Sequence, residues 1–220
     1  MLLYPINDFP LSLYSQNSQC QVALKTGGRL YAQSVALTPT FTQSMALVPL
    51  VQQVWQQAGS PKVDALITAR GPGTFTSLRV ILATAQGLAL AFPKAQIFAP
   101  THFEALGYAA RQAYQGPILI LIDSKRGDWY GQIYDAAPDI QIFKPQDLRL
   151  FLDNNPTYRL MTDFEVDEEF QSYLIDHPQN LAITQLQLFE DKDFNTLKTD
   201  SANQDLKPYY YYQPAYAKKR

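Results

Sequence analysis

Apolar and polar side chains alternate along the start of the chain, which predicts a series of extended strands. The alternation covers residues 11–15 and 21–24 and continues over residues 29–37. The pair Gly27-Gly28 lies between the last two runs, and glycine supplies the positive φ angles that a two-residue hairpin turn requires. We therefore expect the second and third strands to form a β-hairpin.

Two later segments have helical spacing and carry more apolar surface than one packing face needs. In residues 43–58 one stripe holds Met45, Val48, Val51 and Trp55, and a second holds Leu47, Leu50 and Val54. Pro49 either falls in the first turn of this helix or kinks it. Residues 78–91 are apolar on nearly every face, and such a helix is buried on several sides. Two interpretations stay open: helices under the protein's own sheet, or helices that also contact a partner.

The remaining pattern alternates strands and helices. Strands are expected at residues 63–69, 96–99, 117–123 and 128–134. Thr101 and Glu104 have the spacing of a capping box, which predicts a helix from there to about residue 114. Short helices are expected to begin near residue 145 and to cover residues 165–174, before an acidic linker over residues 191–205. Strands and helices recur in similar order in both halves, which is typical of an α/β protein of two related lobes.

Composition and charge exclude several classes of protein. The chain has 220 residues, of which 46% are hydrophobic and 17% charged, so disorder is excluded as the default. Residues 1–134 carry nine basic and five acidic residues (+4), residues 135–205 five and fifteen (−10), and residues 206–220 four basic residues (+4). A protein that binds nucleic acid on its own needs a concentrated basic face, and this distribution of charges does not require one.

The single cysteine excludes a disulfide framework and a zinc site built from several thiolates. The two histidines lie far apart in the sequence, so they do not form a metal-binding pair on one helix. The longest apolar stretch is too short to span a bilayer, and the start lacks the pattern of a signal peptide. We expect a cytoplasmic protein without a membrane partner.

Two features offer candidate chemistry. The turn at Gly71-Pro-Gly73, between a strand and a helix, would present backbone N–H groups to an anion, with Thr74 and Thr76 beside it. The simpler interpretation is a tight connection capped by one of these threonines. Asp123 ends a strand and is a candidate ligand of a metal–nucleotide complex. An Asx-turn with a neighbouring arginine is the favoured alternative. His102 follows the expected cap residue Thr101, and we expect it to be an exposed side chain of the first helical turn.

Four stretches resemble the bacterial TsaB (YeaZ) family. The central one, Gly71-Pro-Gly-Thr-Phe-Thr-Ser-Leu-Arg79, is similar to the family's Gly-Pro-Gly-Ser-Phe-Thr-Gly-Leu-Arg. The others are Thr101-His-Phe-Glu-Ala-Leu106, Asp123-Ser-Lys-Arg-Gly-Asp-Trp-Tyr130 and Pro208-Tyr-Tyr-Tyr-Tyr212. Their order and spacing agree with the family across about residues 10–134 and again at the tail.

The resemblance implies an actin/Hsp70/sugar-kinase-like (ASKHA) fold of two α/β lobes. The first would span residues 1–100, with residues 206–220 packing back on it, and the second, smaller lobe residues 101–205. The implied function is that of a non-catalytic scaffold in tRNA threonylcarbamoyladenosine (t6A) modification. The scaffold would bind and activate a TsaD-like transferase, with a TsaE-like ATPase in the assembly. Alone it would form a homodimer, and it would meet tRNA only through the complex.

The resemblance also implies where the partner binds. The interface would lie on the two helices with excess apolar surface, at Met45, Val48, Val51, Trp55, Leu78, Leu82, Ala85 and Ala89. No cofactor is expected to be held tightly, although a nucleotide is a candidate ligand at a subunit boundary. No metal is expected.

The chain departs from the family pattern at three places. Tyr14 stands where the family's first strand ends in an aspartate, Gln43 replaces a histidine and Ser77 replaces a glycine. These changes argue against independent hydrolysis of Mg–ATP. The alternatives are a metal-dependent glycoprotease-like peptidase or an ASKHA ATPase, either using Asp123 and the Gly71–Gly73 loop. A third alternative is a self-contained homodimer with a binding role.

Overall fold

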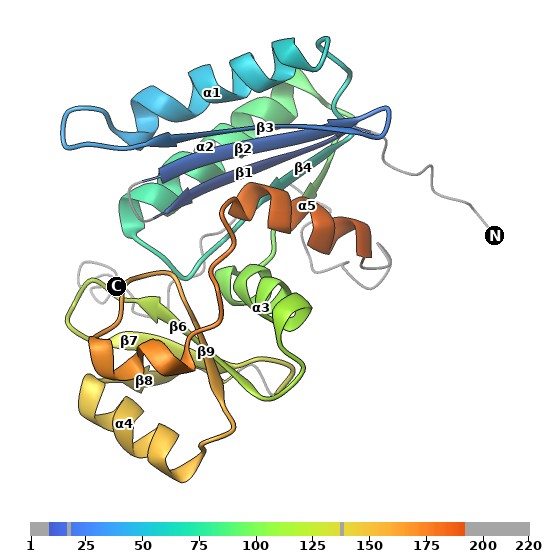
Figure 1. Cartoon of the computed structure of the whole chain (residues 1–220). Helices are drawn as coiled ribbons and strands as arrows, with labels where there is room; N and C mark the ends of the chain where they lie inside the picture. Colours follow the sequence, from blue (N-terminus) through green and yellow to red (C-terminus); the bar gives the residue numbers. More distant parts are fainter. Residues whose placement is uncertain (1–8, 17–18, 137–138, 192–220) are drawn as a thin grey trace, which may run out of the picture.

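The computed structural model describes residues 9–16, 19–136 and 139–191, which form two α/β lobes, one above the other in Figure 1. The first lobe is built on a five-stranded sheet in the order β3-β2-β1-β4-β5. Its strands are β1 (Pro10–Gln16), β2 (Gln19–Thr26), β3 (Arg29–Ala36), β4 (Ala65–Thr68) and β5 (Gln96–Phe98). β1 to β3 are antiparallel, whereas β4 and β5 run parallel to β1. The predicted hairpin is confirmed, with Gly27 and Gly28 at φ 53° and 73°.

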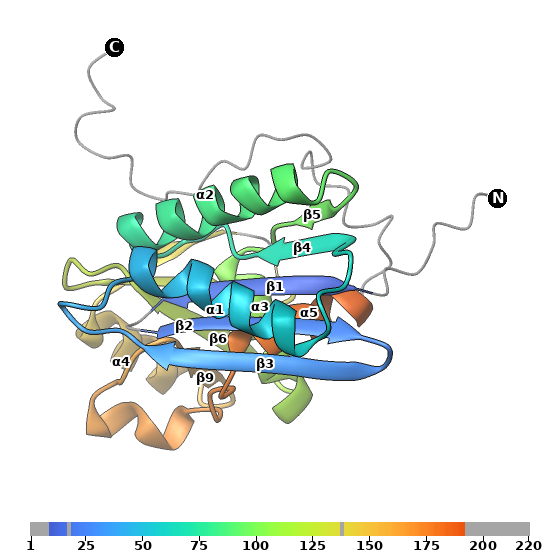
Figure 2. The ribbon, with the colours of Figure 1, turned by 90° about the horizontal axis from the view of Figure 1, so that it is seen from above.

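Helices α1 (Gln43–Gln57) and α2 (Phe75–Ala91) cover one face of this sheet. Figure 2 shows them lying across the strands. Between helices and sheet lies a core of aliphatic side chains that includes Leu13, Val22, Leu47 and Leu66. Pro49 lies inside α1, beyond its first turn, and α1 continues past it.

The second lobe repeats this topology with a smaller sheet in the order β8-β7-β6-β9. Its strands are β6 (Ile118–Asp123), β7 (Trp129–Ile133), β8 (Gln141–Phe143) and β9 (Arg159–Thr162). As in the first lobe, three antiparallel strands precede a fourth that runs parallel to the first. α4 (Pro145–Asn154) packs on this sheet through Leu148 and Leu152. The prediction of two related lobes is therefore confirmed.

Helices α3 and α5 join the lobes. α3 (His102–Ala113) begins with the predicted capping box, in which the Thr101 side chain accepts from the Glu104 N–H and the Glu104 carboxylate accepts from the Thr101 N–H. α5 (Leu181–Asp191) crosses back to the first lobe and contacts β1, β2 and β4. The two helices share one core with residues of both sheets (Figure 1).

The sequence did not predict α5, and the helix expected over residues 165–174 is only a 3-10 helix (Glu168–Tyr173). The domain boundary at residue 100 stays a prediction. Residues 206–220, with the tyrosine run, lie outside the described residues. Within the described part of the chain, no helix is long and apolar enough to cross a membrane.

Candidate functional site

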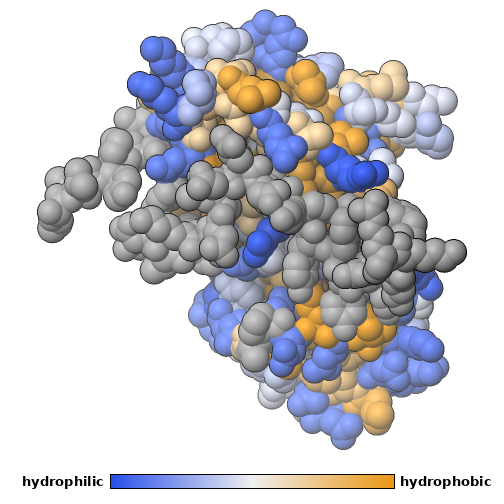
Figure 3. All heavy atoms as spheres, turned by 180° about the vertical axis from the view of Figure 1, so that it is seen from behind, coloured by the Kyte–Doolittle hydropathy of each residue, from blue (hydrophilic) through white to orange (hydrophobic). Residues whose placement is uncertain are grey.

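The outer faces of α1 and α2 form a nearly uncharged surface. Met45 and Val48 of α1 are 55% and 56% exposed, and Phe75 and Leu90 of α2 are 37% and 86% exposed. Residues 30–61 contain no Asp, Glu, Lys or Arg, and the only such residue of α2 is Arg79. Apolar groups gain by leaving water, and uncharged polar groups cost less to desolvate than charged ones, which suits a protein–protein contact. Figure 3 shows apolar side chains among polar ones over the first lobe.

Four residues that the sequence assigned to this surface lie in the lobe's own core, which corrects the assignment. Val51, Leu78, Leu82 and Ala85 are at most 6% exposed. Val51, Leu82 and Ala85 pack in the core between the helices and the sheet, and Leu78 is buried at 1% exposure. Because both helices carry apolar residues on more than one face, the sequence could not decide which face packs on the strands. In the structure the side chains of these four residues are buried. A partner could reach them only if helix and sheet separated.

The other four predicted residues differ in exposure. Met45 and Val48 are open to a partner, whereas Trp55 and Ala89 are half-buried. The Trp55 indole N–H donates to the Pro61 carbonyl at 2.8 Å and its ring packs edge-on against Phe92. Trp55 therefore holds the end of α1 in place. The accessible centre of the surface is Met45 and Val48.

The Gly71–Thr76 turn is hydrogen-bonded within the chain. The Gln16 side chain reaches across from the end of β1, and its Oε1 accepts from the Thr74 N–H at 3.3 Å. Thr74 caps α2 by accepting from the Ser77 N–H at 3.3 Å, and Gln43 donates to the Ser77 hydroxyl at 3.0 Å. Gly73 lies so close to the Gln16 amide that a Cβ would overlap it. The Thr74 N–H of the candidate anion site is thus already paired, while Thr76 is exposed.

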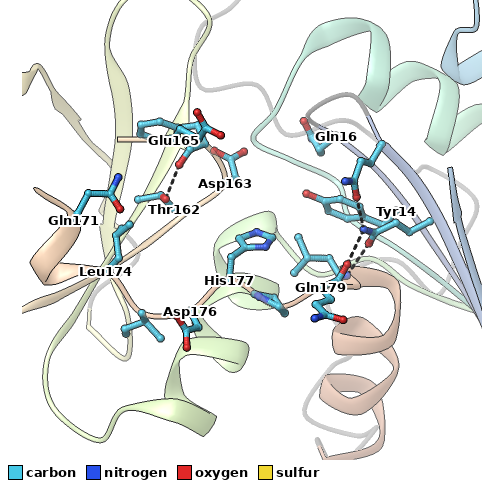
Figure 4. Close-up of a pocket in the computed structure, with 16 residues that line it drawn as sticks. Tyr14, Gln16, Thr162, Asp163, Glu165, Gln171, Leu174, Asp176, His177 and Gln179 are labelled. Carbon is cyan, nitrogen blue, oxygen red and sulfur yellow. Dashed lines mark hydrogen bonds between the residues drawn. The ribbon is translucent and has the colours of Figure 1, made fainter. Parts of the chain in front are cut away.

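A cavity of about 500 Å³ lies between the lobes (Figure 4). The first lobe contributes Tyr14, Gln16 and two glutamines of β2, and the second lobe contributes the segment after β9. The charged residues on its wall are Asp163, Glu165 and Asp176, and no Lys or Arg among the described residues lines it. Burial lowers the pKa of His177, the remaining titratable group apart from Tyr14. The cavity is therefore acidic, and its field disfavours phosphate groups.

Three buried side chains from different elements meet beside this cavity. The Tyr14 hydroxyl lies 3.0 Å from His102 Nε2, and the Asp163 carboxylate lies 3.8 Å from His102 Nδ1. A proton on Nδ1 would face the carboxylate, so this arrangement favours the tautomer in which Tyr14 donates to Nε2. Asp163 also accepts from the Asp123 N–H at 3.0 Å. The Tyr14–His102 hydrogen bond ties β1 to α3, and Asp163 lies beside it beyond hydrogen-bond distance of His102.

His102 is fully buried, so its expected exposure was wrong. It begins α3 where that helix passes between the lobes, and its N–H donates to the Gly71 carbonyl at 2.8 Å. Burial lowers the pKa of His102 to about 4, so the ring is neutral at pH 7. Burial, with the nearby Asp163 charge, raises the pKa of the Tyr14 hydroxyl well above its usual value, so Tyr14 stays protonated.

Asp123 forms the Asx-turn that the sequence favoured, although with a lysine rather than an arginine. Its carboxylate accepts from the Lys125 N–H at 2.6 Å and from the Lys125 ammonium at 2.7 Å. Among the described residues, no group of three or more His, Cys, Asp or Glu side chains could hold a metal ion.

Sequence reasoning missed the link between Tyr14, His102 and Asp163. No spacing connects these positions, because the fold brings together residues far apart in the chain. One signal was available: Asp163 follows a strand, as Asp123 does, and parallel strands deliver such side chains to one sheet edge.

Comparison with known proteins finds similarity to two kinds of protein, TsaD and TsaB. Residues 42–143 match the family model of TsaD, the tRNA N6-adenosine threonylcarbamoyltransferase. Over 126 residues, 56% of this chain, the sequence is 31% identical to the tRNA threonylcarbamoyladenosine biosynthesis protein TsaB of Escherichia coli. It is 28% identical over 124 residues to the protein of that name from Haemophilus influenzae. The matches span about half the length of these curated relatives, 54% and 51%.

Solved structures support the same fold. YeaZ from Pseudomonas aeruginosa superimposes with a TM-score of 0.67 at 20% identity, covering 92% of this chain and 99% of that one. A protein described as similar to peptidase YEAZ from Pseudomonas aeruginosa superimposes with a TM-score of 0.68, also at 20% identity and with the same coverage.

Proposed function

We propose that this chain, which is similar in sequence to TsaB proteins and in fold to YeaZ, is a member of the TsaB (YeaZ) family with an actin/Hsp70/sugar-kinase-like fold, and that it serves tRNA threonylcarbamoyladenosine formation as a non-catalytic subunit. In this role it binds and activates a TsaD-like transferase, and a TsaE-like ATPase joins the assembly. The whole operates in the cytoplasm. On its own the chain forms a homodimer.

The observation that carries the proposal is the uncharged surface of α1 and α2. Met45 and Val48 stand more than half exposed on a helix that has no charged residue. A monomer gains nothing from the exposed part of these side chains, whereas a partner that covers it gains about half of the roughly 1.5–3 kcal/mol that full burial of such a side chain contributes. The buried stripe of the same helices anchors them to the sheet, so the surface is presented as a rigid unit.

Three features support the non-catalytic part of the proposal. Tyr14 replaces a carboxylate at the end of β1, and the Asp123 carboxylate is engaged by Lys125. Gln16 takes up the Thr74 N–H that a phosphate would use. The acidic cavity between the lobes likewise disfavours a tightly held nucleotide, so a nucleotide would sit at a subunit boundary.

The charge of the second lobe supports an indirect route to tRNA. Residues 118–180 have five basic against twelve acidic residues, and a polyanion is repelled by such a lobe. In the proposed assembly tRNA is held by the complex, and this chain contributes through its contact with the transferase.

The proposal is tested by reconstituting threonylcarbamoyl transfer from an added activated threonylcarbamoyl donor to tRNA, with the purified TsaD-like and TsaE-like proteins of the same organism and ATP. We expect product only when this chain is present, and a loss of at least about tenfold for the Met45→Glu/Val48→Glu variant, since about 1.4 kcal/mol of lost binding already gives that factor.

Leu150→Glu is the matched control, because Leu150 is 64% exposed on α4 of the other lobe. It should leave the activity unchanged. Full activity without the chain, or loss of activity in Asp123→Asn with the complex intact, would contradict a non-catalytic role.

A further inference from the structure

A second cavity, of about 430 Å³, lies where the segment after β4 meets the start of α3 and the end of β7. Among the described residues, none lines both this cavity and the acidic one. Its apolar lining comes from α3 and the second lobe and includes Phe103, Ile133, Tyr134 and Ile140. A cavity of this size accommodates a small organic molecule.

Arg70 gives this cavity a cation without a partner. The residue follows β4 and is half-buried. Its Nε atom is fully enclosed, yet the guanidinium forms no hydrogen bond and no ion pair within the part of the chain that the structure describes. A guanidinium has five N–H donors and no acceptor, and an enclosed donor costs free energy until an acceptor reaches it. A carboxylate supplies two oxygen atoms that match this planar set of donors.

Backbone hydrogen bonds fix the point from which the Arg70 side chain starts. The Arg70 N–H donates to the Pro100 carbonyl at 3.0 Å, and the His102 N–H donates to the Gly71 carbonyl at 2.8 Å. These two bonds join the segment after β4 to the start of α3. The cation is therefore carried on an ordered part of the cavity wall, which lowers the cost of ordering it when a ligand binds.

The wall also carries negative charge, on Glu104 and Asp135. The Glu104 carboxylate accepts from the Thr101 N–H at 2.7 Å, and the Asp135 carboxylate accepts from Arg111 at 3.0 Å. Neither carboxylate forms an ion pair with Arg70, so the two signs of charge occupy separate parts of the wall. A dianion would face both carboxylates, whereas a molecule with one carboxylate and one ammonium group matches both signs.

We propose that this cavity binds a free α-amino acid with an apolar side chain. The carboxylate of the ligand pairs with Arg70, and its ammonium group lies toward Glu104 and Asp135. Its side chain packs against the Tyr134 ring, which lies so close to Gly107 of α3 that a Cβ there would overlap it. The site is separate from the α1–α2 surface, so the inference does not depend on the proposed contact with a transferase.

The test is isothermal titration calorimetry of the full chain with L-phenylalanine and two analogues that each lack one charge. Hydrocinnamate lacks the ammonium group and phenethylamine lacks the carboxylate. We expect L-phenylalanine to bind with one molecule per chain, and each analogue to bind at least about tenfold more weakly. Arg70→Gln should weaken the binding of L-phenylalanine by the same factor. Arg79→Gln, which removes an exposed arginine of α2, is the matched control and should bind normally.

NMR of the chain with isotopically labelled arginine gives a readout that does not depend on the fold of a variant. The Arg70 Nε–H signal, assigned by its absence from Arg70→Lys, should shift as L-phenylalanine is added to the unmodified chain. An unmodified chain that does not bind L-phenylalanine at millimolar concentration overturns the proposal, and so does equal binding of either analogue. Undiminished binding to a folded Arg70→Gln variant overturns it as well, because the carboxylate would then be held elsewhere.

Discussion

Acidification should destabilise this protein through one buried histidine. Burial lowers the pKa of His102 to about 4, whereas an unfolded histidine titrates near its usual 6.5. The unfolded state therefore binds more protons between these values, and stability falls as the pH drops through that window. The linkage between proton binding and folding lowers the free energy of unfolding by about 2 kcal/mol at pH 5 and about 3 kcal/mol at pH 4, relative to neutral pH, through His102 alone. Above pH 6.5 the contribution is complete and constant.

The assay is urea unfolding followed by tryptophan fluorescence at several pH values, for the unmodified chain and for His102→Gln. All other titrating groups are common to both proteins, so the difference between their slopes reports His102 together with its effect on the neighbouring His177, whose pKa His102 also lowers. We expect the difference in unfolding free energy to shrink below pH 6.5 by the amounts given. Parallel curves from pH 7 to pH 4 would refute the reasoning, as would a ring that titrates near 6.5 by NMR.

Two further predictions concern the turn and the cap that position α2 and α3. Gly73→Ala should destabilise the fold by about 1–3 kcal/mol, because the new methyl group overlaps the Gln16 amide, and Gln16→Ala should relieve most of that loss in a thermal-unfolding double-mutant cycle. Additive losses would show that the two side chains do not meet. Thr101→Ala should cost about 1 kcal/mol through loss of the α3 cap, seen as a lower Tm, and an unchanged Tm would show that the capping box contributes nothing.

The sequence is informative where local chemistry decides the structure. Gly27-Gly28 specified a hairpin and Thr101 with Glu104 a helix start, because each signal acts within a few residues. The burial of His102 and the position of α5 depend on contacts with strands more than seventy residues away, which no local pattern contains. The α1–α2 surface is intermediate: periodicity identified two apolar helices, but only packing against the sheet decided that Leu82 faces inward and Met45 outward.

The central claim is that Met45 and Val48 form the contact with a TsaD-like transferase. The most direct measurement is light-scattering chromatography of this chain mixed with the TsaD-like protein of its own organism, alongside Met45→Glu/Val48→Glu and the Leu150→Glu control. The account predicts a complex with the unmodified chain and with the control, and none with the double variant, which should remain folded. A double variant that still binds, or an unmodified chain that does not, would contradict it.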